Sequence, residues 1–209
     1  MDIIGVQNER VKRVIALQQK ASLRHQTGTP VVEGHRELQH CLSAGATVVE
    51  AFVCPTLSAQ PLRLPPDTVV RHVSEAVYAR MAYRGTTEGI LAVVRPRRRT
   101  LDQLALPDTP LIIVLESVEK PGNLGAVLRS ADAAPAHAVV VCDPLCDLYN
   151  PNVIRSSIGA VFTVPCVACS SDDCIHFLKQ HGIQILTAQL QDSLPYYHTD
   201  MRRPTAIVM

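Results

Sequence analysis

The sequence contains no apolar run long enough to cross a membrane. A membrane-spanning helix needs about 20 consecutive apolar residues, and no run in this chain reaches ~18. The N-terminal stretch MDIIGVQNERVKR carries its charges after its apolar residues and has no small-residue cleavage site, so it is not a signal peptide. We therefore expect a cytoplasmic protein that makes no contact with a membrane.

A disulfide framework is also missing. The chain has 209 residues and seven cysteines, an odd number, which we interpret as reduced thiols that mostly fill the core. Cys166 and Cys169, together with Cys142 and Cys146, could imitate a zinc site. Cys142 and Cys166 fall in or at the end of expected strands rather than in short loops, so we expect no metal ion.

The chain has almost no net charge, but its charges are unevenly distributed. The formal net charge is +1, yet residues 1–100 hold 14 Lys/Arg against 8 Asp/Glu, and residues 101–209 hold 6 against 11. The basic first half favours contact with a polyanion, the alternative being a chance fluctuation on solvent-exposed faces. With 47% hydrophobic residues, the chain can bury a core in one large domain or two small ones.

The first hundred residues alternate between helical and strand patterns. We expect helices over 8–25 with Asn8 as N-cap, over 35–45 closed by Gly45, and over 74–82 with Ser74 as N-cap. The expected strands are 29–34, 48–54, 68–73 and 89–94. Residues 96–110 break the pattern with prolines and arginines, which predicts an exposed linker between residues 1–95 and residues 111–209.

The second half alternates more cleanly and predicts an open, mostly parallel sheet. Its strands are near-continuous apolar runs, which is typical of parallel strands covered on both faces. Ligands of such sheets bind at the carboxyl ends of the strands. The expected strands are 111–118, 138–143, 161–167, 183–189 and 205–209, and the expected helices are 123–134, 150–160 and 171–182.

The turn after strand 111–118 lacks the glycines of a dinucleotide-binding loop. Only Gly122 and Gly125 are present, and Pro121 removes a backbone N–H that a phosphate would need. An oxidoreductase with a Rossmann fold is therefore disfavoured.

Asn123 and Arg129 are the notable polar residues of the helix that follows. Asn123 is placed to cap this helix. Arg129 lies beside an apolar stripe and needs a partner, because an unpaired buried charge is costly. The intramolecular alternative for that partner is Asp132 or Glu116.

A second strand end repeats the pattern of one asparagine and one arginine. After strand 138–143 comes YNPNVIRSSIGAVF, with Asn150 as helix cap, Pro151 at the first helical position, and Arg155 followed by two serines. Two such strand ends at one edge of a parallel sheet are better explained by a functional site than by two accidental ion pairs.

These two segments carry a resemblance to a known family. PGNLGAVLRSADA and NPNVIRSSIGAVF resemble motifs one and two of the SpoU branch of the SPOUT methyltransferases, which are knotted α/β enzymes. The first half is similar to the substrate-binding domain that often precedes their catalytic domain, a fold related to small RNA-binding ribosomal proteins. Its landmarks here are NERVKRVIALQQKASLR, VVEGHRELQHCLSAG and TTEGILAVV.

The resemblance implies an RNA 2′-O-ribose methyltransferase that uses S-adenosylmethionine and works as a homodimer. Ribosomal RNA is the first expectation for the substrate, and transfer RNA is the second. Arg129 would act on the ribose hydroxyl and Asn123 would hold that arrangement. Motif two would contact substrate or a second chain through Asn150, Asn152, Arg155 and Ser156, and the first half would bind RNA through Arg10, Lys12, Arg13, Arg24, His35 and Arg36.

The chain departs from the family pattern in one respect that affects the expected cofactor pocket. The third motif, a Ser-Leu-Asn stretch, and the Gly-x-Glu turn expected after AIVM have no counterpart. We therefore expect an incomplete knot and a cofactor pocket completed beyond Met209, with Met209 and its neighbours at the edge of that pocket. The alternative is a non-catalytic, RNA-binding, dimeric relative that has lost cofactor binding.

Overall fold

The computed structural model describes residues 5–58, 61, 63–83 and 88–209. Residues 1–4 and the first two residues of the landmark TTEGILAVV lie outside this range. By packing, the chain divides into two units. Unit 1 comprises Met1–Arg97 and Tyr149–Thr163, and unit 2 comprises Arg98–Leu148 and Val164–Met209.

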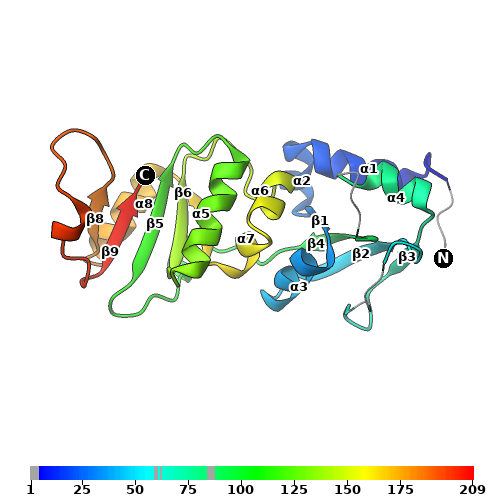
Figure 1. Ribbon diagram of the computed structural model, residues 1–209, viewed down its shortest axis with the longest axis horizontal. Coiled ribbons are helices and arrows are strands. Elements are labelled where there is room, and N and C mark those ends of the chain that lie inside the picture. The colour runs from blue at the N-terminus through cyan, green and yellow to red at the C-terminus, as the bar shows by residue number, and fades with distance from the viewer. Residues whose placement is uncertain (1–4, 59–60, 62, 84–87) are drawn as a thin grey trace. The chain divides into compact units, whose positions relative to one another are not determined.

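Unit 1 is built on a four-stranded mixed sheet (Figure 1). Its strands follow the order β1-β4-β2-β3, with β4 antiparallel to β1 and β2, and β3 parallel to β2. The helices α1 and α4 pack on one face through a core that includes Phe52, Tyr78 and Leu91. The bounds are α1 Glu9–Gln19, α2 Ala21–Thr27, β1 Val31–Glu33, α3 His35–Ser43, β2 Thr47–Val53, β3 Val70–His72, α4 Glu75–Met81 and β4 Ile90–Arg95.

The expected single helix over 8–25 is wrong, because the chain breaks at Lys20. Asn8 caps α1 as predicted, and its Oδ1 accepts from the Arg10 N–H at 2.9 Å. Lys20 is extended, and α2 begins at the next residue. The buried Arg24 guanidinium donates to the Leu17 carbonyl at 2.7 Å and to the Gln18 carbonyl at 3.0 Å. These carbonyls lie at the end of α1, where helical partners run out, so Arg24 stabilises the break.

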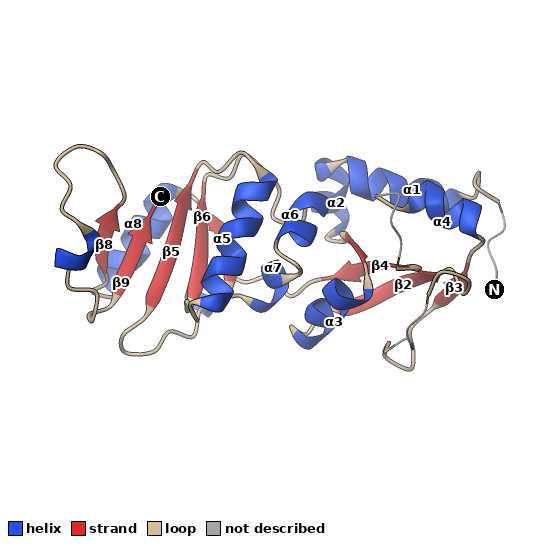
Figure 2. Ribbon diagram, in the orientation of Figure 1, coloured by secondary structure: helices blue, strands red, loops and turns tan. Residues whose placement is uncertain are grey.

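Unit 2 is an open sheet of five parallel strands, which confirms the expected fold class. The order is β7-β6-β5-β9-β8, and Figure 2 shows β5, β6, β8 and β9 running in one direction. The bounds are η1 Leu101–Gln103, β5 Leu111–Glu116, α5 Pro121–Ala133, β6 Ala138–Cys142, β7 Cys166–Cys169, α8 Ser171–Gln180, β8 Gln184–Thr187, η2 Tyr196–His198 and β9 Thr205–Val208.

Helices cover both faces of this sheet, as near-continuous apolar strands require. In Figure 1, α5 lies on one face and α8 on the other. Ile112, Val114 and Val140 point towards the α8 side, where they form a core with Phe177 and Leu178. Apolar residues therefore occupy successive positions along each strand.

The expected exposed linker is partly packed. Leu101, Leu104 and Leu106 lie against the core of unit 2, and a capping box between Thr100 and Gln103 fixes η1. Pro96 and Pro110 are buried. The leucines that lie among the prolines provide apolar surface for this packing. The high proline and arginine content of the segment had instead led to the expectation of an exposed linker.

The expected strand over 161–167 is also wrong in its first half. The chain forms α6 (Pro151–Ser156) and then α7 (Ala160–Thr163) before β7 begins at Cys166. Ile158 and Gly159 take the left-handed conformation between the two helices, with φ values of 57° and 81°. A Cβ on Gly159 would lie only 3.0 Å from the Cβ of His40 on α3, so this close approach favours glycine.

Among the described residues, no helix is long and apolar enough to cross a membrane.

Candidate active site at the carboxyl edge of the parallel sheet

The strands of unit 2 end at one edge, and hydrogen bonds tie these ends together. The Ser117 N–H donates to the Cys142 carbonyl at 2.9 Å, and the Asp143 N–H donates to the Cys169 carbonyl at 2.9 Å. Both Ser117 and Asp143 are left-handed non-glycine residues, with φ values of 49° and 45°. Such conformations cost energy and are concentrated at functional sites.

Asp143 also fixes the start of α8. Its Oδ2 accepts from the Ser171 N–H at 3.0 Å and from the Ser171 hydroxyl at 2.6 Å. These two bonds lower the pKa of Asp143 below its usual range, because they stabilise the charged carboxylate. The ionised Asp143 carboxylate therefore links the end of β6 to the start of α8.

Motif one enters α5 through the short segment 117–120 after β5. The buried face of α5 holds Leu124, Gly125, Leu128 and Ala131, and Arg129 is exposed beside it. The intramolecular pair with Asp132 or Glu116 is wrong, because no ion pair joins Arg129 to either within the described residues. The Glu116 carboxylate instead accepts from the Ser117 hydroxyl. Arg129 is thus free to meet another molecule.

The expectation that Asn123 caps α5 is wrong. The helix begins two residues earlier, with Lys120 at the N-cap and Pro121 at the first helical position. Pro121 fits there because its fixed φ suits a helix and its missing N–H needs no partner. Asn123 lies in the first turn with an exposed side chain, so it has no capping role.

Motif two belongs to unit 1. The expected cap is confirmed, since Asn150 Oδ1 accepts from the Asn152 N–H at 2.8 Å. Ser156 is engaged in the helix, where its hydroxyl donates to the Asn152 carbonyl at 2.6 Å. The Asn152 side chain is exposed, and Arg155 is half-buried.

Arg155 lines a charged pocket of unit 1 with a volume of about 270 Å³. Arg36 and three glutamates, Glu33, Glu37 and Glu88, also line it. No sequence pattern indicates this pocket, because its residues come from segments far apart along the chain.

The basic residues expected to bind RNA differ in exposure. Lys12 and Arg13 lie on the solvent-exposed side of α1, and Arg36 is exposed on α3. Lys12 forms an exposed ion pair with Glu9 at 2.8 Å. Arg10 is committed to Glu50 at 2.8 Å, and the Arg71 guanidinium binds the same carboxylate oxygen at 2.6 Å.

Two of the residues expected to contact RNA have buried side chains. Arg24 is 3% exposed and holds the end of α1, so it does not face solvent. His35 is 8% exposed, and its Nε2 lies 3.2 Å from the Ser58 hydroxyl. Both side chains are buried because their polar atoms find partners inside unit 1.

Two protein-family models match the chain in succession. The MRM3-like substrate binding domain matches residues 8–92, and the SpoU rRNA Methylase family matches residues 110–209. A crystal structure of an RNA 2′-O ribose methyltransferase is 34% identical, with a TM-score of 0.82, and the match covers 100% of this chain and 81% of that one. The chain belongs to the SpoU rRNA methylase family.

Other relatives of this SpoU protein agree with the assignment. The 23S rRNA (guanosine(2553)-2′-O)-methyltransferase RlmP of Bacillus subtilis is 27% identical, and the match covers 99% of this chain and 81% of the relative. A structure of an AdoMet-bound rRNA methyltransferase from Sinorhizobium meliloti has a TM-score of 0.88 at 22% identity, over 100% of this chain and 80% of that one. The latter likeness supports the fold.

Two further features of the SpoU chain were missed from the sequence. Cys142, Cys169 and Cys174 come together at the carboxyl edge, whereas Cys166 and Cys146 stay outside that group. A cavity of about 520 Å³ lies between the ends of β8 and β9 and the segment that joins them. Only the strand order brings these residues together, and the sequence does not state that order.

The two motif asparagines should differ in their effect on stability. Asn150→Ala removes a helix cap and should lower the free energy of unfolding by about 1 kcal/mol, within the ~0.5–2 kcal/mol range for such caps. Asn123→Ala removes an exposed side chain without a cap bond and should change it by less than about 0.5 kcal/mol. Urea denaturation of both variants measures the difference. Equal losses would contradict the assignment of Lys120 as the N-cap of α5.

Proposed function

We propose that the protein transfers a methyl group from S-adenosylmethionine to a ribose 2′-hydroxyl of RNA, with ribosomal RNA as the first expected substrate and transfer RNA as the second. The observation that supports this proposal is the match of the whole chain to 81% of an RNA 2′-O ribose methyltransferase at 34% identity. We further propose that residues 1–95 bind the substrate and that residues 111–209 carry out the methyl transfer. We also propose that the protein is cytoplasmic, as expected for an enzyme that modifies ribosomal RNA. The non-catalytic alternative is not favoured.

The cavity at β8 and β9 fits the expected cofactor. Its volume of about 520 Å³ lies within the ~300–1,000 Å³ typical of small-molecule pockets. Apolar side chains suited to a purine line it, namely Ile185, Leu186 and Ile207. Thr187, Asp192 and Ser193 add hydroxyl and carboxylate groups that can bind ribose hydroxyls and an amine.

The position of this cavity follows from the strand order. β5 is central, with β6 on one side and β9 on the other; after β7 at one edge the chain crosses to β8 at the opposite edge and then enters β9 beside β5. Ligands of open parallel sheets bind outside the carboxyl ends of the strands. Met209 lies there, where its carbonyl accepts from the Glu116 N–H at 3.1 Å.

Arg129 has a positioning task in this reaction. S-adenosylmethionine supplies an already activated methyl group, so the protein must align the ribose hydroxyl and assist the loss of its proton. Arginine is a poor base, since its pKa lies above about 12. Its planar guanidinium matches a phosphate with two parallel hydrogen bonds. We therefore assign Arg129 to an RNA phosphate that holds the hydroxyl in place.

Replacement of Arg129 tests the proposed activity. Arg129→Ala should reduce methyl transfer at least ~100-fold, because positioning contributions reach this size. Arg129→Lys should be nearly as damaging, because a lysine ammonium cannot make the two-pronged contact. The measurement is transfer of tritium from labelled S-adenosylmethionine to ribosomal RNA, with Lys179→Ala, an exposed cation on α8, as the control. Near-normal turnover of Arg129→Ala would refute the assignment.

RNA binding by unit 1 should depend strongly on salt. Each phosphate neutralised by Lys or Arg releases a counterion, so the affinity falls as salt rises. Arg13→Ala and Arg36→Ala should each weaken binding and reduce the slope of log affinity against log salt by about one. Fluorescence anisotropy with a ribosomal RNA fragment measures this, with Lys179→Ala in the acidic half unchanged. Binding that does not respond to salt would refute the role of these arginines.

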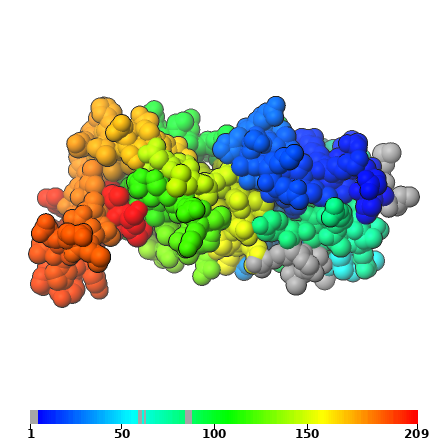
Figure 3. Space-filling view, turned by 90° about the horizontal axis from the view of Figure 1, so that it is seen from above, coloured from blue at the N-terminus to red at the C-terminus, as the bar shows by residue number. Residues whose placement is uncertain are grey.

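We also propose a homodimer formed through unit 2. Supporting it, Leu190 and Tyr197 are 92% and 70% exposed in the segment between β8 and β9, and this segment forms a continuous orange surface in Figure 3. Large exposed apolar groups of this kind mark interaction surfaces.

Sedimentation equilibrium should show a dimer at concentrations on the order of tens of micromolar, an ordinary range for protein association. A variant with Leu190→Asp and Tyr197→Asp should be monomeric, because two charges would lose their solvation in the interface. Only monomer for the unaltered chain would rule the dimer out.

A further inference from the structure

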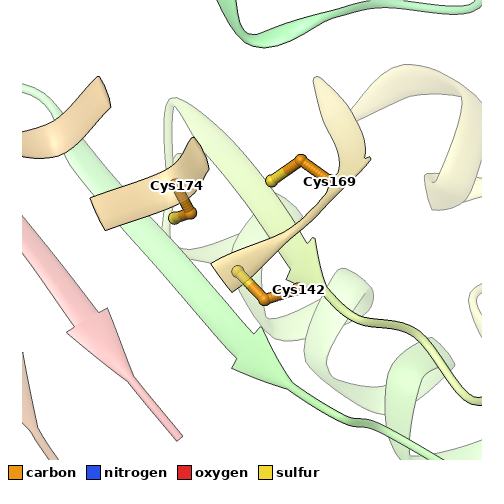
Figure 4. Close-up of side chains that lie close together, drawn as sticks. All are labelled: Cys142, Cys169 and Cys174. Atoms are coloured by element: carbon orange, nitrogen blue, oxygen red, sulfur yellow. The ribbon is translucent and has the colours of Figure 1, made fainter. Parts of the chain in front are cut away.

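Three cysteines of unit 2 converge at the carboxyl edge of its sheet. Cys142 is the last residue of β6, Cys169 is the last residue of β7, and Cys174 lies in the first turns of α8. Their sulfur atoms all lie within 4.8 Å of one another. Figure 4 shows the three side chains lying close together.

The fold brings these thiols together by simple geometry. Cys142 and Cys169 are register partners on adjacent parallel strands, so their side chains leave the same face of the sheet. The helix α8 covers that face, and the link from β7 to α8 is only one residue long. Cys174 therefore returns over the two strand ends.

A layer of hydrogen bonds holds the segment that carries Cys174. The Ser170 hydroxyl accepts from the Asp173 N–H at 3.1 Å and donates to the Asp173 carboxylate at 2.6 Å. Asp143, next to Cys142, binds both the N–H and the hydroxyl of Ser171. These hydrogen bonds link the backbone segments that carry the three cysteines. Outer-shell partners hold the ligands of metal sites in place in the same way.

The charges around the cluster suit a bound cation. Asp143, Asp172 and Asp173 lie on the adjoining segments. These carboxylates make the surroundings of the three thiols favourable for a positive ion.

The alternative is that these cysteines only fill the core. Cys142 and Cys174 do pack with apolar neighbours such as Phe177 and Leu178. Core packing alone gives no reason for three sulfur atoms to meet at one point. Cys169 also lines a hollow of about 380 Å³ with Asp173 and His176, which offers an ion a route to the cluster.

We propose that Cys142, Cys169 and Cys174 form a three-thiolate site for one thiophilic metal ion of the Zn²⁺ class. Thiolates are the preferred ligands of such ions. Zinc–sulfur bonds of about 2.3 Å place tetrahedral ligands roughly 3.8 Å apart, which small side-chain rotations can reach from the present separation. Binding releases the three thiol protons to solvent, involves no redox step, and leaves a fourth position for water. No His, Asp or Glu atom of the described residues completes the group.

Metal titration of the reduced 209-residue chain tests the site. One Zn²⁺ should bind per chain in competition with a chromophoric chelator, and Co²⁺ in its place should show sulfur-to-cobalt charge-transfer absorption. Cys169→Ser should weaken binding by more than the roughly 10–100-fold caused by loss of an outer-shell partner. Cys146→Ser, outside the cluster, should bind like the unaltered chain. Absence of stoichiometric binding, or equal binding by Cys169→Ser, would overturn the site.

A measurement on the unaltered chain avoids dependence on the folding of a variant. Alkylation of each cysteine, followed by mass spectrometry, should show that Zn²⁺ protects Cys169 while the reactivity of Cys146 stays the same. Both residues are partly exposed, so both can react when no metal is bound. Equal alkylation of Cys169 with and without Zn²⁺ would overturn the proposal.

Discussion

The pairing of β5 with β6 on one side and β9 on the other is the constraint on which unit 2 depends. It places β5 at the centre of the sheet and sets every strand end on one edge. The hydrogen bonds of Ser117 and Asp143 then fix the register of these ends. A ligand pocket, a polar helix start and a thiol cluster follow at that edge because parallel strands deliver their carboxyl ends together.

The sequence predicted local structure well where short-range chemistry decides it. The caps at Asn8 and Asn150 and the parallel sheet follow from patterns within a few residues. The prediction was wrong where a long-range contact or an unusual helix start determines the structure. The Arg24 guanidinium stabilises a break that helical periodicity does not reveal, and Pro121 starts α5 ahead of the asparagine that resembled its cap.

Charge in the sequence did not translate directly into a binding surface. Arg10 and Arg24 both count towards the charge of the basic half, yet Arg10 neutralises a buried glutamate and Arg24 is buried with internal partners, as is the neutral His35. Arg13 and Arg36 keep their exposure. Which basic side chains can reach a phosphate therefore depends on tertiary partners, which composition cannot supply. The family resemblance identified the motif that contains Arg129, and the structure adds that no ion pair joins this arginine to another of the described residues.

The cysteine cluster and motif one share the same backbone. The Cys142 carbonyl accepts from the Ser117 N–H, and Ser117 begins the segment that leads into the helix of Arg129. A metal ion that joins β6, β7 and α8 would restrain this strand end and, through it, the start of α5. The thiols would then affect activity by ordering the backbone that presents Arg129, without any contact with RNA. An exposed arginine needs such a rigid support, because a misplacement of about 1 Å in a positioning group costs much of its effect.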